Sequence, residues 1–381
     1  MKTSSFSIKI IVSVIVIVLI IIACLTGLKS RDTSTIKIGA LIPLSGPGAT
    51  LGEWMQKGAL AAQEEINANG GINGRRIELV IEDDKCGGPS GIAAYRKLYD
   101  AQGVRYFAGP LCAAARIPVL KNSEADKSLI ITTGLAVIYG QNTTATTFNV
   151  LPSVGIVTEK ILNYGFDTMK IKGVSLLTVN DEIGTETEVT FNKLLARRGM
   201  ATSHIERFTK GTSDMRTEIT KIINDSSDAV LVVGFTADYA VFMRQARDLG
   251  LKKTILAISP VQAPDVAKAN IGTGLVITYP HPSATQSESA QTFLGMYQKK
   301  DSTASIMSPV YLGSGYDAVK IIALAIETCG NDIACADKTI SNLQNYPGAN
   351  GSITFGEKGN VNSAESIEIR QLKEGVFSGV K

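Results

Sequence analysis

Few side chains in this sequence are spaced for covalent or metal chemistry. The two histidines, His204 and His281, lie far apart, and no CxxC pair accompanies them, so nothing indicates a metal site. Ser45 lies in a Leu-Ser-Gly-Pro segment and lacks the Gly-x-Ser-x-Gly context of a hydrolase nucleophile. Asp83 and Asp84 follow a strand-like run beside a lysine, which favours a solvated loop over a catalytic acid pair. We therefore expect no metal, no cofactor and no catalytic residue.

The five cysteines indicate cross-links instead of catalysis. Cys24 ends an N-terminal apolar run, which leaves four cysteines, and four can form two disulfides. Cys329 and Cys335 bound a short polar loop, whereas Cys86 and Cys112 each follow a strand-like run. Disulfides form in an oxidising compartment. Four buried free thiols are the alternative.

The N-terminal residues predict export from the cytoplasm. Lys2 and Lys9 precede an apolar run from Ile10 to Ala23, which is the pattern of a secretory signal. The tetrad 21–24 (IIAC) resembles the bacterial lipobox, in which the cysteine, here Cys24, receives lipid and becomes the first residue. An uncleaved membrane anchor and simple secretion are the alternatives, because the run is short for a spanning helix. All three place the body of the chain outside the cytoplasm.

Length and charge narrow the class of protein. The chain has 381 residues, and removal of an export segment would leave about 350, enough for two lobes of ordinary domain size. The formal charge is +3, and +1 remains without Lys2 and Lys9. A net charge this small does not indicate a nucleic-acid-binding protein. It also does not indicate a basic surface for lipid headgroups.

Strand-like and helix-like segments alternate along the chain. Strands are expected at 36–43, 76–82, 106–110, 128–132, 173–178, 201–208, 229–234, 254–258 and 274–279, and helices at 52–69, 90–103, 114–126, 185–198, 212–224, 237–249, 289–300 and 314–328. This alternation predicts an α/β fold of parallel sheets covered on both faces, with ligands at the carboxyl ends of the strands. Two lobes fit the number of strands better than one sheet, with crossings near the prolines at 151–152 and 279–282.

Six segments resemble those of a known family, in the same order. They are 38–47 (IGALIPLSGP), 62–75 (AQEEINANGGINGR), 83–86 (DDKC), 109–112 (GPLC), 242–252 (FMRQARDLGLK) and 351–359 (GSITFGEKG). They resemble type I periplasmic binding proteins, most closely the leucine/isoleucine/valine-binding branch, over roughly residues 36 to 377. The resemblance implies two doubly wound parallel-sheet lobes joined by a three-crossing hinge that closes over a ligand. It also places Cys86 and Cys112 in the disulfide-bearing loops of that branch.

The resemblance divides the chain into segments. Residues 1–24 would be the signal with its lipobox, or a membrane anchor, and residues 25–35 a linker. Lobe I would comprise 36–152 and 280–356, and lobe II would comprise 153–279 and 357–381.

The resemblance also indicates the ligand-binding positions. In the amino-acid binders, a Ser, a Thr and main-chain N–H groups of lobe I hold the α-carboxylate, and a Tyr and an acid of lobe II complete the site around the ammonium. At these four side-chain positions this chain has Ala113, Ala136, Ile183 and Val261. Main-chain donors could still bind an anion near Ala113, but a buried ammonium without a carboxylate is costly. Asp181, Glu182 or Asp238 could substitute for the missing acid.

The remaining candidate ligand-binding residues come from the same comparison. They are Ser45, Leu51, Leu111, Gly134, Phe235, Thr236 and Tyr311. The expected function is the extracytoplasmic solute-binding subunit of an ABC importer for an amino acid, an amide-like compound or a small organic acid. The alternative is a ligand sensor on the same fold that signals to a partner. The expected partners are the ligand, the ABC permease and, through the N-terminus, the membrane, but not nucleic acid.

Overall fold

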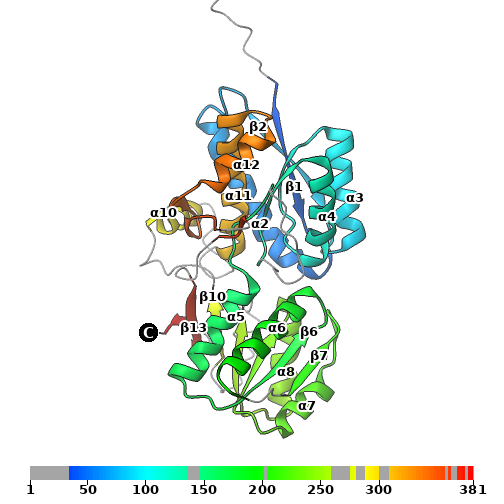
Figure 1. Ribbon diagram of the computed structural model, residues 1–381, viewed down its shortest axis with the longest axis vertical. Helices are drawn as coiled ribbons and strands as arrows, with labels where there is room; N and C mark the ends of the chain where they lie inside the picture. Colours follow the sequence, from blue (N-terminus) through cyan, green and yellow to red (C-terminus); the bar gives the residue numbers. More distant parts are fainter. Residues whose placement is uncertain are drawn as a thin grey trace, which may run out of the picture.

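The computed structural model describes residues 34–135, 146–200, 204–258, 275–279, 288–299, 309–356, 359–361, 367–373 and 376–380. These residues form two α/β lobes stacked along the long axis of the molecule (Figure 1). Each lobe is built on one sheet, and helices cover both faces of it. We call the elements on the first sheet lobe I and those on the second sheet lobe II.

The sheet of lobe I is entirely parallel. Its order is β2 (Ile77–Asp83), β1 (Ile36–Ile42), β3 (Tyr106–Ala108), β4 (Leu129–Thr132) and β5 (Thr147–Asn149). Ile36 lies opposite Ile77, and the register continues to Ile42 and Asp83. The last five residues of β1 are buried, as expected for a central parallel strand covered on both faces.

Two groups of helices cover this sheet. On one face lie α2 (Ala49–Ala68), α11 (Pro309–Cys329) and α12 (Ile333–Ser341), and on the other lie α3 (Gly88–Arg96) and α4 (Ala113–Asp126). The short helix α10 (Glu288–Gln298) packs on the hairpin of β11 (Tyr346–Gly348) and β12 (Gly351–Ile353).

The crossing of α2 and α11 depends on two glycines. A Cβ atom at Gly58 would lie 1.8 Å from the Leu312 carbonyl oxygen, and one at Gly315 would lie 2.1 Å from the Met55 oxygen. The two backbones can approach this closely only because both positions lack a side chain.

The sheet of lobe II is mixed. Its order is β14 (Val376–Gly379), β13 (Glu368–Lys373), β10 (Val276–Tyr279), β9 (Thr254–Ile258), β8 (Ala229–Val233), β6 (Val174–Val179) and β7 (Ile205–Phe208). The strands from β10 to β7 are parallel, as predicted. The sequence did not predict β13 and β14, which run antiparallel to their neighbours at one edge.

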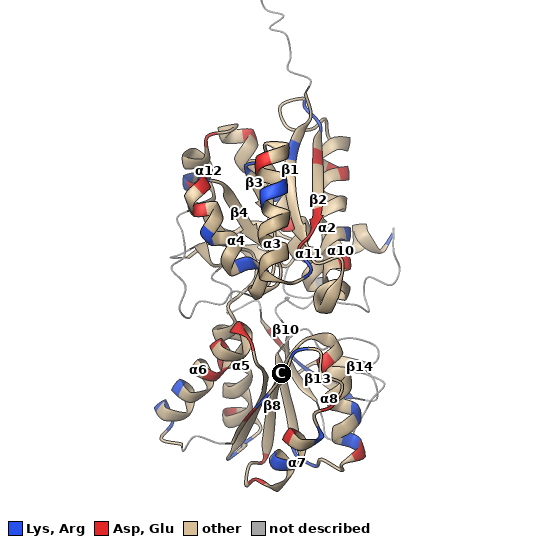
Figure 2. Ribbon diagram, turned by 90° about the vertical axis from the view of Figure 1, so that its right-hand side faces the viewer, with Lys and Arg blue, Asp and Glu red and all other residues tan. Residues whose placement is uncertain are grey.

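Two pairs of helices cover the second sheet. One pair is α5 (Val154–Asn163) with α6 (Glu182–Arg197), and the other is α7 (Arg216–Asn224) with α8 (Thr236–Asp248). Figure 2 shows that the positions of acidic and basic residues are interspersed over the helices of the two lobes. Within the described ranges, none of the helices is long and apolar enough to span a bilayer. The predicted export segment and Cys24 lie outside these ranges.

The chain passes between the lobes three times. β5 belongs to the first sheet, and the next helix, α5, packs on β9 and β10 of the second. After β10 the chain returns to lobe I with α10, α11 and α12, and β13 then rejoins the second sheet. Lobe I is therefore assembled from two stretches of sequence that are separated by most of lobe II.

Candidate functional site

A small cavity lies where the two lobes meet. Lobe I lines it with Leu51, Leu111, Cys112, Gly134, Leu135 and Tyr311, and lobe II lines it with Ile183, Val233, Gly234, Phe235 and Ile258. Its volume is about 30 Å³, which is room for about one or two water molecules. The lobes are therefore nearly closed on each other.

The cavity lies at the carboxyl ends of the parallel strands of both sheets. Val233 ends β8 and Ile258 ends β9, and both contribute to the wall. The helices α4, α6 and α8 begin a few residues after β3, β6 and β8. Their N-termini therefore point their partial positive charge towards this region.

The N-terminus of α4 has main-chain N–H groups without an acceptor among the described residues. Cys112 is the N-cap residue, and no side chain caps the helix. The N–H groups of Ala115 and Arg116 donate to the Cys112 carbonyl oxygen, whereas those of Ala113 and Ala114 make no hydrogen bond among the described residues. In α6, by contrast, the Asp181 carboxylate accepts from the N–H groups of Ile183 and Gly184.

A buried cation lies behind this part of the wall. The side chain of Arg116 is on α4, and the residue is 2% exposed. Its Nη1 donates to the carbonyl oxygen of Leu135, a wall residue, at 2.9 Å, and its Nη2 has no hydrogen-bond partner. Burial lowers the pKa of Arg116 to about 10, although the charges of Glu182 and Glu186 act in the opposite direction.

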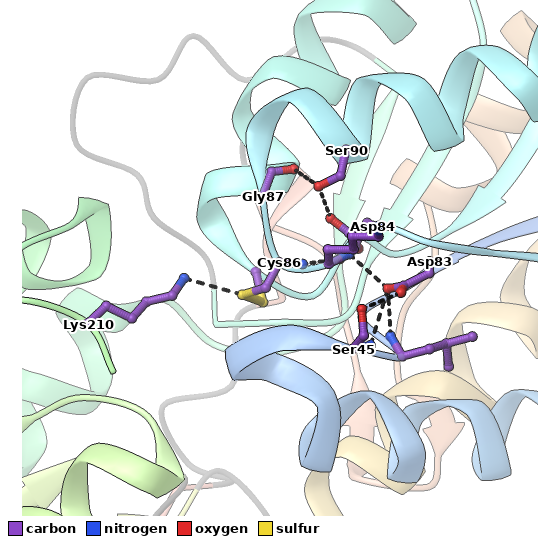
Figure 3. Close-up of a disulfide and its surroundings, with 10 residues drawn as sticks. Ser45, Asp83, Asp84, Cys86, Gly87, Ser90 and Lys210 are labelled. Carbon is purple, nitrogen blue, oxygen red and sulfur yellow. Dashed lines mark hydrogen bonds between the residues drawn. A yellow bond between two sulfur atoms is a disulfide. The ribbon is translucent and has the colours of Figure 1, made fainter. Parts of the chain in front are cut away.

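A second cation reaches across the gap from lobe II. Figure 3 shows Lys210 extending towards the disulfide of lobe I, with its Nζ 3.5 Å from Cys86 Sγ. The same Nζ lies 4.6 Å from the ring centroid of Phe235, a wall residue. The charge of Lys210 also acts on the carboxylates of Asp84, Asp181 and Asp238, where it opposes the rise that burial causes in their pKa. Lys210 thus bridges a wall residue of lobe II and the cystine of lobe I.

The two acids before Cys86 differ in environment. Asp83 accepts hydrogen bonds from Ser45 Oγ at 2.6 Å and from the Leu44 and Lys85 N–H groups at 2.9 Å each. Asp84 is fully buried; its Oδ1 accepts from the Cys86 N–H at 2.8 Å and its Oδ2 has no partner. Burial raises the pKa of Asp84 to about 6. The expectation of a solvated loop is therefore wrong for Asp84, because its main chain turns the carboxyl group inward.

Comparison with known proteins decides the family. A model described as "periplasmic binding protein" matches residues 35–375. The chain belongs to this family of periplasmic binding proteins.

Relatives support this assignment along more than nine-tenths of the chain. The Leu/Ile/Val-binding protein homolog 3 of Brucella melitensis is 25% identical over 94% of this chain and 97% of its own. A leucine-binding protein of Thermotoga maritima superposes with a TM-score of 0.82 at 22% identity, covering 91% of this chain and 98% of its own. A solute-binding protein of an ABC transporter from Rhodopseudomonas palustris, in complex with p-hydroxybenzoic acid, gives 0.82 at 19% identity, covering 91% and 96%. These structures confirm the fold of two α/β lobes built on largely parallel sheets.

The binding-protein cleft gathers many of the candidate residues. The wall of the cavity contains the candidates Leu51, Leu111, Gly134, Ile183, Phe235 and Tyr311. Ala113 is buried at the start of α4, and Thr236 is the first residue of α8, but neither lines the cavity. Ser45 is also absent from the wall, and its hydroxyl donates to Asp83. Ala136 and Val261 lie outside the described residues.

Sequence reasoning missed several wall positions. They are Leu135, Val233, Gly234 and Ile258. Cys112 also lines the cavity, although the sequence indicated only a disulfide for it. The rule that parallel strands present ligand sites at their carboxyl ends could have found Val233 and Ile258.

Both predicted disulfides are present in this binding protein. Cys86 is bonded to Cys112, and Cys329 is bonded to Cys335. The first joins the loop before α3 to the N-terminus of α4, so it fixes a wall residue. The second links the end of α11 to α12, far from the cleft.

Proposed function

We propose that this binding protein is the extracytoplasmic capture subunit of an ABC importer and that it takes a small carboxylate-bearing ligand between its lobes. The observation that carries the proposal is the cavity lined from both lobes beside the open N–H groups of Ala113 and Ala114. An anionic group at this helix N-terminus is stabilised by the donors and by the helix dipole. Relatives named for leucine, isoleucine and valine, and one in complex with p-hydroxybenzoic acid, all bind carboxylates.

Closure of the lobes is the proposed mechanism. A ligand that touches both lobes contacts its full set of partners only in the closed form, so binding shifts the population towards that form. The proposed contacts are the main chain at Ala113 and the side chains of Leu51, Leu111, Ile183, Phe235 and Tyr311. The permease would then recognise the closed form.

The division into lobes and the membrane attachment belong to the same proposal. Lobe I would comprise residues 36–152 and 280–356, and lobe II residues 153–279 and 357–381, after a linker of 25–35. Lipidation of Cys24 would hold the body of the protein at the outer surface of the membrane. Metabolic labelling with a radioactive fatty acid tests this, and a Cys24→Ala variant should lose both the label and the membrane fraction.

The decisive experiment identifies the ligand directly. Mass spectrometry of small molecules released from the denatured protein gives candidates, and each candidate is then tested in a thermal-shift assay, since a ligand that binds only the folded state raises the Tm. We expect a small carboxylate that raises the Tm in wild type but not in a Phe235→Asp variant. A protein that binds no small carboxylate would contradict the proposal. A ligand-dependent response of a signalling partner without uptake would favour the sensor instead.

A further inference from the structure

The described wall of the cleft contains no charged side chain. The eleven wall residues are aliphatic, aromatic, glycine or cystine, and Tyr311 supplies the single hydroxyl among them. An α-amino acid brings both a carboxylate and an ammonium into this space. The ammonium would lose its water shell and gain no carboxylate from these walls, which is unfavourable.

The acids near the cleft are already engaged. The Asp181 Oδ1 accepts from two N–H groups at the start of α6, at 2.9 and 3.1 Å. Asp238 accepts from the N–H groups of Gly211 and Phe235, both at 2.9 Å. Asp84 is buried beneath the cystine loop, and Glu182 does not line the cavity. Asp181 and Asp238 therefore already accept from main-chain donors, and none of the three substitutes considered lines the cavity.

The positive groups, in contrast, lie where they would attract an anion. The uncapped N-terminus of α4 offers the N–H groups of Ala113 and Ala114. Arg116 lies behind wall residue Leu135 with Nη2 unpartnered. Lys210 lies over wall residue Phe235, and its charge is shared with the carboxylates of Asp84, Asp181 and Asp238, so Arg116 is the cation that favours a ligand anion here. The N-terminus of α4 is thus suited to an anion, and the apolar wall residues suit a hydrocarbon body.

We propose that the cleft selects an apolar monocarboxylate without an ammonium group, such as an aromatic or branched aliphatic acid, over the corresponding α-amino acid. This inference rests on the proposed function and specifies its ligand class. Selectivity follows because removal of the ammonium eliminates the unpaired charge while the carboxylate and the apolar contacts remain.

Matched ligand pairs test the proposal. The full chain is unfolded and refolded to remove bound ligand, and calorimetry then compares 4-methylpentanoate with L-leucine, and 3-phenylpropanoate with L-phenylalanine. Because an unpaired buried charge opposes binding, we expect the acid of at least one pair to bind roughly 100-fold more tightly than its amino acid. Equal or tighter binding of the amino acids would overturn the inference while leaving the proposed function intact. Failure of every small carboxylate to bind would overturn both.

A variant designed to reverse the preference between acid and amino acid gives an independent test. Ile183 is a half-buried wall residue, so Ile183→Glu places a carboxylate in the cleft, and Ile183→Gln is its uncharged control of the same size. Relative to the Gln variant, the Glu variant should bind L-leucine at least tenfold more tightly and 4-methylpentanoate more weakly. Circular dichroism verifies that both variants fold. The same preference in the two variants would contradict the proposal.

Discussion

Asp84 lies fully buried in the loop that carries the cleft cystine, and one of its carboxylate oxygens has no partner. Burial raises its pKa from 3.8 to about 6, although the Cys86 N–H and the charge of Lys210 act against this shift. Between these two pH values the folded chain binds more protons than the unfolded chain. The contribution of Asp84 to the free energy of unfolding therefore decreases as the pH rises through this window.

Replacement of Asp84 by Asn should stabilise the protein at neutral pH. The Asn oxygen can accept from the Cys86 N–H, and its NH₂ group replaces the unpartnered oxygen without a charge. We expect the free energy of unfolding at pH 7.5 to rise by about 1–3 kcal/mol, and the difference to disappear near pH 4. Urea denaturation across the pH range measures this.

Asp83→Asn is the matched control for this prediction. Burial alone would raise the pKa of Asp83, but hydrogen bonds from Ser45 and from main-chain N–H groups lower it. Its ionised form is therefore favoured in the folded state, and the Asn variant should be less stable than wild type at pH 7.5. Equal effects of the two substitutions would contradict the assignment.

Lys210 offers a second prediction for a single residue. Its ammonium contacts the Phe235 ring and the Cys86 sulfur, so it joins the lobes only while they are closed. Lys210→Met should weaken ligand binding by roughly two- to tenfold, because a cation–π contact of this kind contributes about 0.5–1 kcal/mol or more. Calorimetry with the identified ligand measures the loss, and Lys210→Arg should retain most of the affinity. Unchanged binding in the Met variant would show that the contact is incidental.

Among the elements, those with the plainest sequence patterns were predicted best. β9 was predicted with its observed bounds, and β8 to within one residue, because short apolar runs rich in β-branched residues are typical of buried strands. α5 and α12 were missed, the latter because the segment from Cys329 to Cys335 was interpreted as a loop. β13 was missed because its charged residues conceal the strand pattern and because one of its two neighbours in the sheet, β10, is distant in sequence.

The close crossing of α2 and α11 could not be predicted from sequence. In the sequence Gly58 is simply a glycine within a helix, and its contact with Leu312 joins residues far apart in the chain. Gly58→Ala should lower the free energy of unfolding by about 1–3 kcal/mol, since the helices must move apart. Gly295→Ala is the control: no atom lies within 4 Å of its Cβ position, so the gain in helix propensity should be neutral or stabilising by up to about 1 kcal/mol. Urea denaturation measures both variants. If they were equally stable, the close contact between α2 and α11 at Gly58 would be contradicted.

At the scale of the whole molecule, the small cavity requires motion. A volume of about 30 Å³ holds about one or two waters, so a ligand of amino-acid size enters only when the lobes move apart. The three crossings of the chain are the natural site of that motion.

The ligand-free protein should therefore be more extended in solution than the complex. Small-angle scattering should show the radius of gyration falling when ligand is added to wild type, and no change for Phe235→Asp. An identical radius with and without saturating ligand would rule out closure as the binding mechanism.

The order of the lobes along the chain also affects how the protein matures. α2 is made early, yet the largest part of its packing surface belongs to α11, which ends at Cys329. During synthesis, the apolar face of α2 therefore stays exposed to solvent until most of the polypeptide has left the ribosome. Chains that end before α11 leave this apolar face exposed, so their proteolysis should begin in lobe I.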